Sequence, residues 1–284
     1  METLEDRVAV VTGAASGIGR ALAELFVERG SSVVLADVEA GPLAAAVAEL
    51  EAGGATVLGV PTDVADGASV QALADAAVER FGAVHVLCNN AGVSGLVGRS
   101  WATPLQDWEW VLGVNVMGVV HGIRSFLPIL LQQTKAHVVN TGSAACFETV
   151  PGMAPYGASK HAVLGISEAL RLELLAAGAN VGVTVLVPGD VVNTPIMASD
   201  RNWPERLGAR QEPDADPVAT VVRMGFAAAM AGGVEPRRCA SAAIEAILGG
   251  QFLVCDDPEQ LAGWGRHPGH LAAGQQPVWP PAPA

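Results

Sequence analysis

Short apolar runs, many of them rich in valine, alternate along the chain with longer stretches in which apolar residues recur every three or four positions. The first pattern is typical of buried strands and the second of amphipathic helices. The runs predict strands at 7–12, 32–37, 56–60, 84–88, 136–141, 181–187 and 251–255. The longer stretches predict helices at 17–29, 40–52, 67–81, 104–132 and 155–177.

Apolar strands that alternate with helices favour a parallel sheet covered on both faces. Because crossovers between parallel strands are right-handed, we expect an α/β, doubly wound parallel sheet of about seven strands, the Rossmann fold. It would form one domain over residues 1–255. Residues from about 193 to 216 lack periodicity and contain three prolines, which predicts a mobile loop with a short helix. Residues 256–284 contain six prolines and predict an extended or irregular C-terminal tail.

The composition excludes several classes of protein. Half of the 284 residues are hydrophobic and 16% are charged, which is too apolar for a disordered chain. A net charge of −13 is opposite to that of a nucleic-acid binder. No stretch approaches the roughly 18 to 20 unbroken apolar residues of a membrane span, so we expect no membrane partner. The four cysteines and six histidines follow no metal-site pattern, and the N-terminus lacks an apolar signal region. These features predict no metal and a cytoplasmic location.

A glycine-rich turn joins the first predicted strand to the first predicted helix. It runs from Thr12 to Gly19 and includes Gly13 and Gly17. Glycines at such a turn let a pyrophosphate approach the N-terminus of the helix, where free N–H groups and the helix dipole favour an anion. An ordinary strand–helix turn is the alternative interpretation, but the strand–turn–helix context is the one that dinucleotide binding requires.

Asp37 ends the second predicted strand, eighteen residues after Gly19. At about this distance a carboxylate meets the adenosine ribose hydroxyls in dinucleotide folds. A carboxylate repels the 2′-phosphate of NADP, and Ala14, Ala15 and Val38 offer that phosphate no cation. The sequence therefore predicts NAD as the cofactor.

Tyr156 and Lys160 lie four residues apart at the start of a predicted helix, so both project from one face. The chain has a single tyrosine and two lysines. A nearby ammonium group lowers the pKa of a tyrosine, usually about 10, and so equips it for proton transfer with an alcohol or ketone. Ser143 follows the fifth strand and could hydrogen-bond the reacting oxygen. Asn115 is polar among apolar neighbours in the long helix, where helix–helix contact is the alternative role.

Together these motifs resemble the short-chain dehydrogenase/reductase family, in its compact single-domain branch. The resemblance runs from about Arg7 to Cys255 and rests on TGxxxGIG (12–19), NNAG (89–92), Asn115, Ser143, YxxxK (156–160) and Pro188-Gly189. It implies an NAD-dependent oxidoreductase that transfers a hydride between a secondary alcohol or ketone and nicotinamide. It implies Tyr156 as general acid/base, Lys160 as the residue that tunes Tyr156 and binds the ribose, Ser143 as orienting the substrate oxygen, and Asn115 as part of a proton relay.

The resemblance also implies a set of cofactor-binding residues and a homo-oligomer, a tetramer in this family. The cofactor-binding set is Gly13, Ser16, Gly17, Ile18, Gly19, Asp37, Asp63, Val64, Asn90, Gly92, Tyr156, Lys160, Pro188, Gly189, Val191 and Thr194. One departure concerns the loop after Gly189, where the family places a threonine five residues after the proline. Asn193 holds that position here and Thr194 follows it, and Asp190 stands where an apolar residue is common.

The residues expected around the reacting centre are mostly apolar, which favours an apolar alcohol or ketone as the small-molecule substrate. Packing of the core or of a subunit contact would explain the same residues. Two alternatives stay open: a carbonyl reductase that prefers NADP, and a cofactor-binding relative that has lost catalysis. An enoyl reductase is disfavoured, because that branch separates its tyrosine and lysine by more residues.

Overall fold

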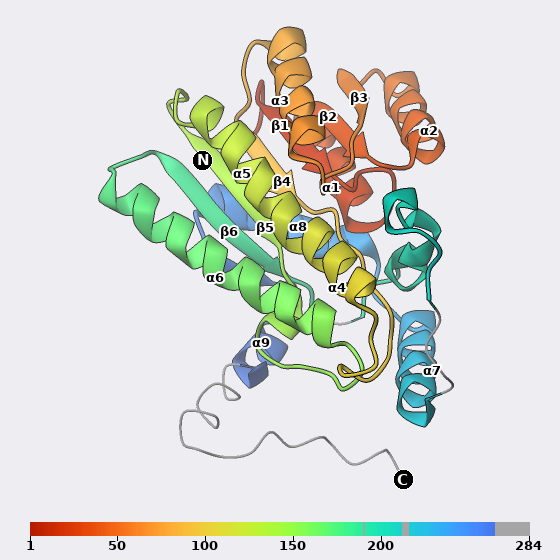
Figure 1. Ribbon diagram of the computed structural model, residues 1–284. Coiled ribbons are helices and arrows are strands. Elements are labelled where there is room, and N and C mark those ends of the chain that lie inside the picture. The colour runs from red at the N-terminus through yellow and green to blue at the C-terminus, as the bar shows by residue number, and fades with distance from the viewer. Residues whose placement is uncertain (190, 212–215, 265–284) are drawn as a thin grey trace.

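The computed structural model describes residues 1–189, 191–211 and 216–264. Seven parallel strands form one sheet in the order β3-β2-β1-β4-β5-β6-β7 (Figure 1). The strands are β1 (Val8–Thr12), β2 (Ser32–Asp37), β3 (Val57–Pro61), β4 (Val86–Asn89), β5 (Ala136–Thr141), β6 (Val181–Val187) and β7 (Leu253–Cys255). This confirms the doubly wound α/β fold. The strand order reverses between β1 and β4, and ligands of such sheets bind at that point, beyond the carboxyl ends of the strands.

Helices cover both faces of the sheet. The front face in Figure 1 carries α3 (Gly67–Phe81), α5 (Gly118–Leu130) and α6 (Ala154–Ala176). The opposite face carries α1 (Gly17–Glu28), α2 (Ala40–Ala52) and α8 (Pro236–Gly249). The side chains of successive strand residues point to opposite faces of the sheet. Val10 packs in the core of the front face with Phe126, and Val11 packs in the opposite core with Phe26. Two-sided burial explains why the strands are apolar throughout.

The remaining elements lie near the carboxyl ends of the strands. They are α4 (Leu105–Leu112), the π-helical turn η1 (Gly113–Met117), the 3-10 turns η2 (Ala144–Cys146), η3 (Pro195–Asn202) and η4 (Glu205–Leu207), and the helices α7 (Pro217–Ala231) and α9 (Pro258–Trp264). Helices α7 and α8 were not predicted from the sequence. The expected single helix over 104–132 is divided by η1, and the loop predicted at 193–216 contains two 3-10 turns.

The start of the predicted irregular tail is helical. The Asp257 carboxylate accepts hydrogen bonds from the backbone N–H groups of Glu259 (3.1 Å) and Gln260 (3.3 Å), which caps α9. The expectation of an extended or irregular tail is therefore wrong for 258–264, because a local side-chain cap allows a helix there. Residues 265–284, which hold the other five prolines of the tail, lie outside the described residues.

The elements α4, η1 and α5 form one helical rod. Over Leu105–Leu130 it is the one helical stretch, among the described residues, that is long and apolar enough by its mean hydropathy to cross a membrane. It is not an unbroken apolar run, because Asp107, Glu109 and Arg124 interrupt it. Phe126 and Leu130 of this rod are fully buried against the sheet, and the same test is passed by core helices of many proteins. Its packing identifies the rod as a core helix.

Candidate active site

A cleft of about 670 Å³ lies at the carboxyl ends of the strands and spans the β1–β4 switch point. All of the site residues predicted from the sequence line it except Gly19 and Asn115. The fold thus brings together residues from Gly13 to Thr194. Within the described ranges, no group of three or more His, Cys, Asp and Glu side chains is placed to hold a metal ion.

The glycine-rich turn forms the floor of one half of the cleft. Gly13 and Gly17 have φ angles of 66° and 58°, a backbone region that favours glycine. Gly19 lies behind the turn, where a Cβ atom would overlap the carbonyl oxygen of Gly13. Ser16 makes no side-chain cap at the start of α1, so the first N–H groups of this helix keep their capacity to bind an anion. The turn therefore fits a dinucleotide pyrophosphate.

Two carboxylates are fixed by backbone N–H groups at the ends of β2 and β3. Asp37 accepts hydrogen bonds from the N–H groups of Ala15 and Glu39, both at 3.0 Å, and is 8% exposed. Asp63 accepts one from the N–H of Ala65 at 2.9 Å. The Asp37 carboxylate thus stands at the edge of the cleft in a defined orientation.

Asn90 connects three strand ends below the cleft. Its side-chain N–H donates to the carbonyl oxygen of Thr12 (3.0 Å), and its side-chain oxygen accepts from the hydroxyl of Thr141 (3.1 Å). Its backbone N–H donates to the Thr12 hydroxyl at 2.9 Å. Asn90 therefore holds β1, β4 and β5 together as well as lining the cleft.

Ser143, Tyr156 and Lys160 converge at the other half of the cleft. Ser143 begins η2, where its hydroxyl accepts from the N–H of Ala145 (3.2 Å) and hydrogen-bonds the side chain of Tyr156. One turn along α6, the ammonium nitrogen of Lys160 donates to the carbonyl oxygen of Thr141 at 2.8 Å. It lies 5.6 Å from the centre of the Tyr156 ring. The predicted hydroxyl, phenol and amine thus share one wall.

Burial dominates the electrostatics of this wall. It raises the pKa of Tyr156 above the usual value, and the hydrogen bond with Ser143 opposes that rise. It also lowers the pKa of Lys160 to about 8, because the ammonium form is poorly solvated there. The expectation that Lys160 lowers the pKa of Tyr156 is wrong for this structure: burial raises that pKa, and the hydrogen bond with Ser143 is what opposes the rise.

Asn115 lies at the centre of the π turn and is 1% exposed. Its side-chain oxygen accepts from the N–H of Val93 (2.9 Å), and its amide donates to the Val93 carbonyl and the Ser159 hydroxyl, both at 3.0 Å. Both amide hydrogens are used by protein atoms. The side chain therefore joins η1 to α6 and to the chain after β4 instead of facing the cleft. A π turn is common at functional sites, because it changes which backbone carbonyls are free.

The loop after Gly189 shows which of its two candidate residues reaches the cleft. Thr194 lines it, and its methyl carbon lies 3.0 Å from the place where a Cβ on Gly17 would stand. Asn193 is exposed, and its backbone N–H donates to the Val234 carbonyl at 3.0 Å. Asp190 lies outside the described residues.

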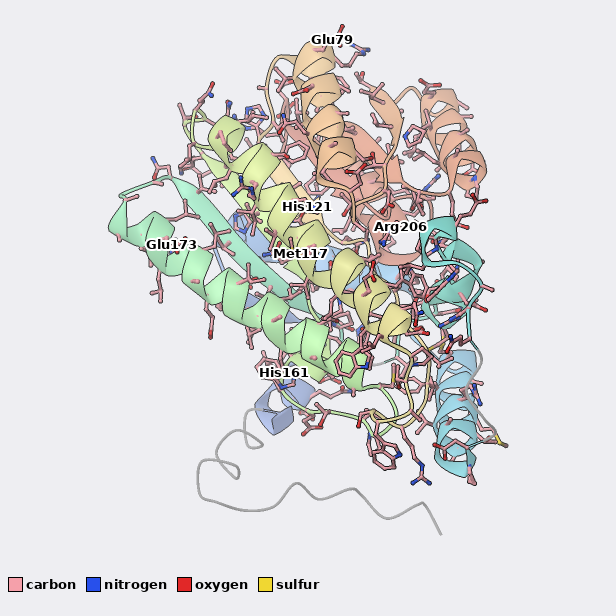
Figure 2. All side chains as sticks on the ribbon, in the orientation of Figure 1. Glu79, Met117, His121, His161, Glu173 and Arg206 are labelled. Carbon is pink, nitrogen blue, oxygen red and sulfur yellow. The ribbon has the colours of Figure 1, made fainter. Side chains whose placement is uncertain are left out.

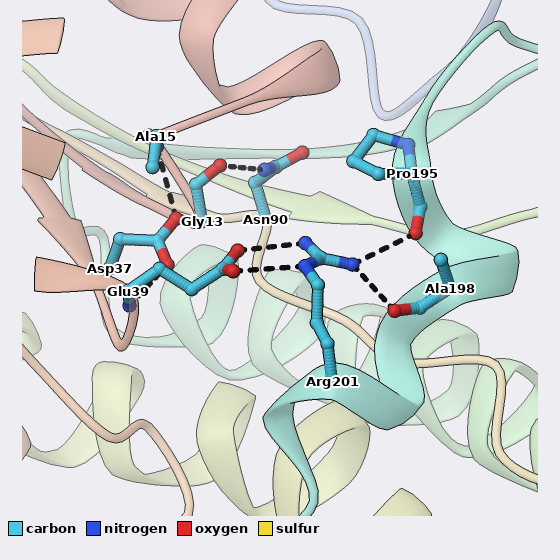
Figure 3. Close-up of polar contacts among 8 residues, drawn as sticks. All are labelled: Gly13, Ala15, Asp37, Glu39, Asn90, Pro195, Ala198 and Arg201. Atoms are coloured by element: carbon cyan, nitrogen blue, oxygen red, sulfur yellow. Dashed lines mark hydrogen bonds and ion pairs between the residues drawn. The ribbon is translucent and has the colours of Figure 1, made fainter. Parts of the chain in front are cut away.

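Sequence reasoning missed several residues that shape the cleft. Asp256 accepts a hydrogen bond from the N–H of Gly189 at 2.8 Å and pairs with Arg238 at 3.0 Å, so it holds the turn after β6. It directly follows β7, and the rule that polar residues after parallel strands meet at one edge would have found it. Arg201 also lines the cleft and pairs with Glu39 across it (Figure 3). No local pattern signals that contact.

The sheet order and the glycine turn at its switch point define a dinucleotide-binding α/β fold. The model of the short chain dehydrogenase family matches residues 7–205. The chain is 43% identical over 221 residues to 1-deoxy-11-beta-hydroxypentalenate dehydrogenase of Streptomyces exfoliatus, an alignment that covers 77% of this chain and 79% of the relative. The chain therefore belongs to the short-chain dehydrogenase/reductase family, whose members are oxidoreductases that use nicotinamide cofactors.

Solved structures agree with this assignment. A short chain dehydrogenase/reductase from Burkholderia phymatum, crystallised in complex with NAD, superposes with a TM-score of 0.94 at 43% identity and covers all of both chains. Levodione reductase superposes with a TM-score of 0.74 at 28% identity, covering 91% of this chain and 98% of its own. Oxidoreduction of an alcohol or ketone group is thus the chemistry of the family.

Proposed function

We propose that this protein is an NAD-dependent dehydrogenase that oxidises a secondary alcohol to a ketone. The observation that carries the proposal is the convergence of Ser143, Tyr156 and Lys160 on one half of a cleft whose other half ends at Asp37. The glycine turn, the uncapped start of α1 and the Asp37 carboxylate fit the pyrophosphate and ribose of a nicotinamide dinucleotide. That cofactor would supply the hydride acceptor.

The protein's own residues would handle the proton. Tyr156 would remove the hydroxyl proton as the alcohol is oxidised and return it when a ketone is reduced. Ser143 would orient the reacting oxygen by a hydrogen bond. Lys160 has three N–H donors and gives one to Thr141, which leaves two for ribose hydroxyls and for a proton path. Asn115 would act through the backbone of its π turn, since both of its amide hydrogens are used.

Cofactor choice provides one test of the proposal. We expect the double variant Asp37→Ala, Val38→Arg to weaken NADH binding and strengthen NADPH binding, because it replaces a carboxylate with a cation beside the ribose. The combined change in preference should be roughly a hundredfold, since it removes one like-charge contact and adds one ion pair. Dissociation constants from NADH and NADPH fluorescence would measure it. An unchanged preference would refute the role of Asp37. The single variant Asp37→Ala distinguishes the effect of the lost carboxylate from that of the added arginine.

The half of the cleft near Tyr156 supports a neutral, apolar substrate. Val150, Met153, Met197 and Phe226 line it and pack with Tyr156. Besides Lys160, the described cations that line the cleft are Arg201 and Arg206. Both belong to the segment over the dinucleotide half, and each is paired with a carboxylate. Among the described residues that line the cleft, no arginine therefore lies near the reacting centre to receive a substrate carboxylate.

A panel of secondary alcohols and ketones, with NAD and with NADP, tests direction and substrate class together. We expect NAD-linked oxidation of apolar cyclic alcohols, read by nicotinamide absorbance. Activity confined to ketones with NADPH would favour the carbonyl reductase instead. No turnover of any substrate, with NADH still bound, would favour the relative that has lost catalysis. The similarity to a dehydrogenase named for 1-deoxy-11-beta-hydroxypentalenate supports inclusion of fused-ring alcohols in the panel.

We further propose a homotetramer in the cytoplasm, with residues 1–255 as its single catalytic domain. Helices α4 and α6 and the turn η1 expose apolar side chains on the front face, which include Leu105, Met117, Leu172 and Leu175. Figure 2 shows Met117 and His161 on this face. Such a patch is typical of a surface that a second copy covers. Light scattering would give the molar mass in solution.

A further inference from the structure

The segment after β6 crosses the dinucleotide half of the cleft and touches both of its sides. At one side Thr194 contacts the glycine turn, with its methyl carbon 3.0 Å from the place of a Gly17 Cβ. At the other side Arg201 of η3 forms an ion pair with Glu39, which follows β2 (Figure 3). Gly17, Glu39, Thr194 and Arg201 all line the same cleft. The segment therefore lies over the part of the cleft between the pyrophosphate and ribose positions.

The Arg201 guanidinium makes four hydrogen bonds, two of which join this segment to the opposite wall. It donates to both carboxylate oxygens of Glu39, at 2.9 and 2.7 Å. It also donates to the backbone carbonyls of Pro195 (3.1 Å) and Ala198 (2.8 Å), within its own segment. A planar two-point contact of this kind is the geometry in which arginine binds a carboxylate most strongly. The pair raises the pKa of Arg201 and lowers that of Glu39, so both stay charged near neutral pH.

The same pair stands beside the carboxylate expected to bind the adenosine ribose. The N–H of Glu39 donates to Asp37 at 3.0 Å, and Asp37 acts electrostatically on Arg201. The neighbours of this carboxylate in the chain, and the glycine turn, offer a 2′-phosphate no cation. The fold brings Arg201 to this place from 162 residues away. Glu39 already occupies the edge of the guanidinium that a phosphate would use.

We propose that Glu39 and Arg201 determine cofactor selection as a pair: their ion pair holds the η3 segment over the adenosine ribose, and Glu39 prevents the guanidinium from binding a 2′-phosphate. This inference rests on the proposed function, since it concerns the same nicotinamide dinucleotide. The ion pair must break when the dinucleotide leaves. Loss of either side chain should therefore speed release, whereas only loss of Glu39 should free a cation for NADPH.

Two single variants separate the two roles. Arg201→Ala should release NADH about fivefold faster, the size expected for a bidentate pair whose side chains are partly exposed, and should leave NADPH binding weak. Glu39→Gln should also speed NADH release, but it should bind NADPH about fivefold more tightly, because the guanidinium then loses its bidentate carboxylate partner and can turn to a phosphate. The double variant should lose that gain. Arg29→Ala is the matched control, because it removes an exposed ion pair with Glu245 that lies between α1 and α8.

The experiment uses the full chain and two measurements. Stopped-flow fluorescence, with bound NADH displaced by excess NAD, gives the release rate, and equilibrium titration gives the NADPH dissociation constant. Added potassium chloride should speed release from the wild type and have little effect on Arg201→Ala, since salt screens the pair. Equal release rates in wild type and Arg201→Ala, or no gain in NADPH affinity in Glu39→Gln, would overturn the inference. A wild type that binds no dinucleotide would instead refute the proposed function.

Discussion

Replacement of Tyr156 by phenylalanine should lower the turnover number for alcohol oxidation about a thousandfold, the range in which a positioned general base contributes. The substitution removes one hydroxyl and keeps the ring that packs with Met153 and Phe226. No other tyrosine exists in the chain to take over the proton. Initial rates with saturating NAD and the best alcohol of the panel would measure the loss.

Two further measurements on Tyr156→Phe keep the interpretation clear. NADH affinity should change little, because the glycine turn and Asp37 stay intact. The ultraviolet difference spectrum of the wild type should show tyrosinate forming only above the usual pKa of about 10, since burial raises the pKa of Tyr156. That signal should be absent from the variant. Retention of full turnover would remove Tyr156 from its proposed role.

Much of the fold was predictable because the strands are buried on both sides. Continuous apolar runs gave the bounds of β2, β5 and β6 as the structure has them. Helix α8 was missed although its pattern is amphipathic: Cys239, Ala240 and Ala243 share its buried face with Ile244 and Ile247. Its start at Pro236 and the left-handed Gly250 at its end were the available signals.

The candidate site was predictable where its residues follow strands or share one helix face. The position of Lys160 one turn after Tyr156 needs only helical spacing. The π turn at Asn115 could not be predicted in this way, because apolar spacing does not show an extra residue in one turn. Tertiary hydrogen bonds to Val93 and Ser159 accompany it.

Contacts between distant segments explain what the sequence could not reveal. The Arg201–Glu39 pair depends on the path of two 3-10 turns, for which no periodic pattern exists. The pKa of Tyr156 likewise depends on burial, which raises it. A prediction from the neighbouring Lys160 alone had the opposite direction. Local motifs therefore predicted which residues line the candidate site, and the fold decided its electrostatics.

Replacement of Lys160 by methionine should lower the kcat/KM for alcohol oxidation about a hundredfold and move its rise with pH to higher pH. In the wild type the Lys160 pKa is lowered to about 8, so the ammonium form predominates below that pH and favours the Tyr156 phenolate. Above pH 8 this charge is progressively lost. The wild-type profile should therefore rise less steeply beyond that point, and the variant should show no such change in slope.

Methionine is unbranched and one atom shorter than lysine, and it removes the charge and the donors, so the wall around Tyr156 should stay packed. Lys135→Met is the matched control, because the other lysine is exposed, pairs with Glu2 at 3.2 Å and does not line the cleft. It should reproduce the wild-type profile. Lys160→Met should also bind NADH more weakly, because the Lys160 donor to the ribose is lost, whereas Tyr156→Phe should not. If Lys160→Met kept both the wild-type profile and the wild-type NADH affinity, Lys160 would have neither of its proposed roles, and the proton would leave Tyr156 by another path.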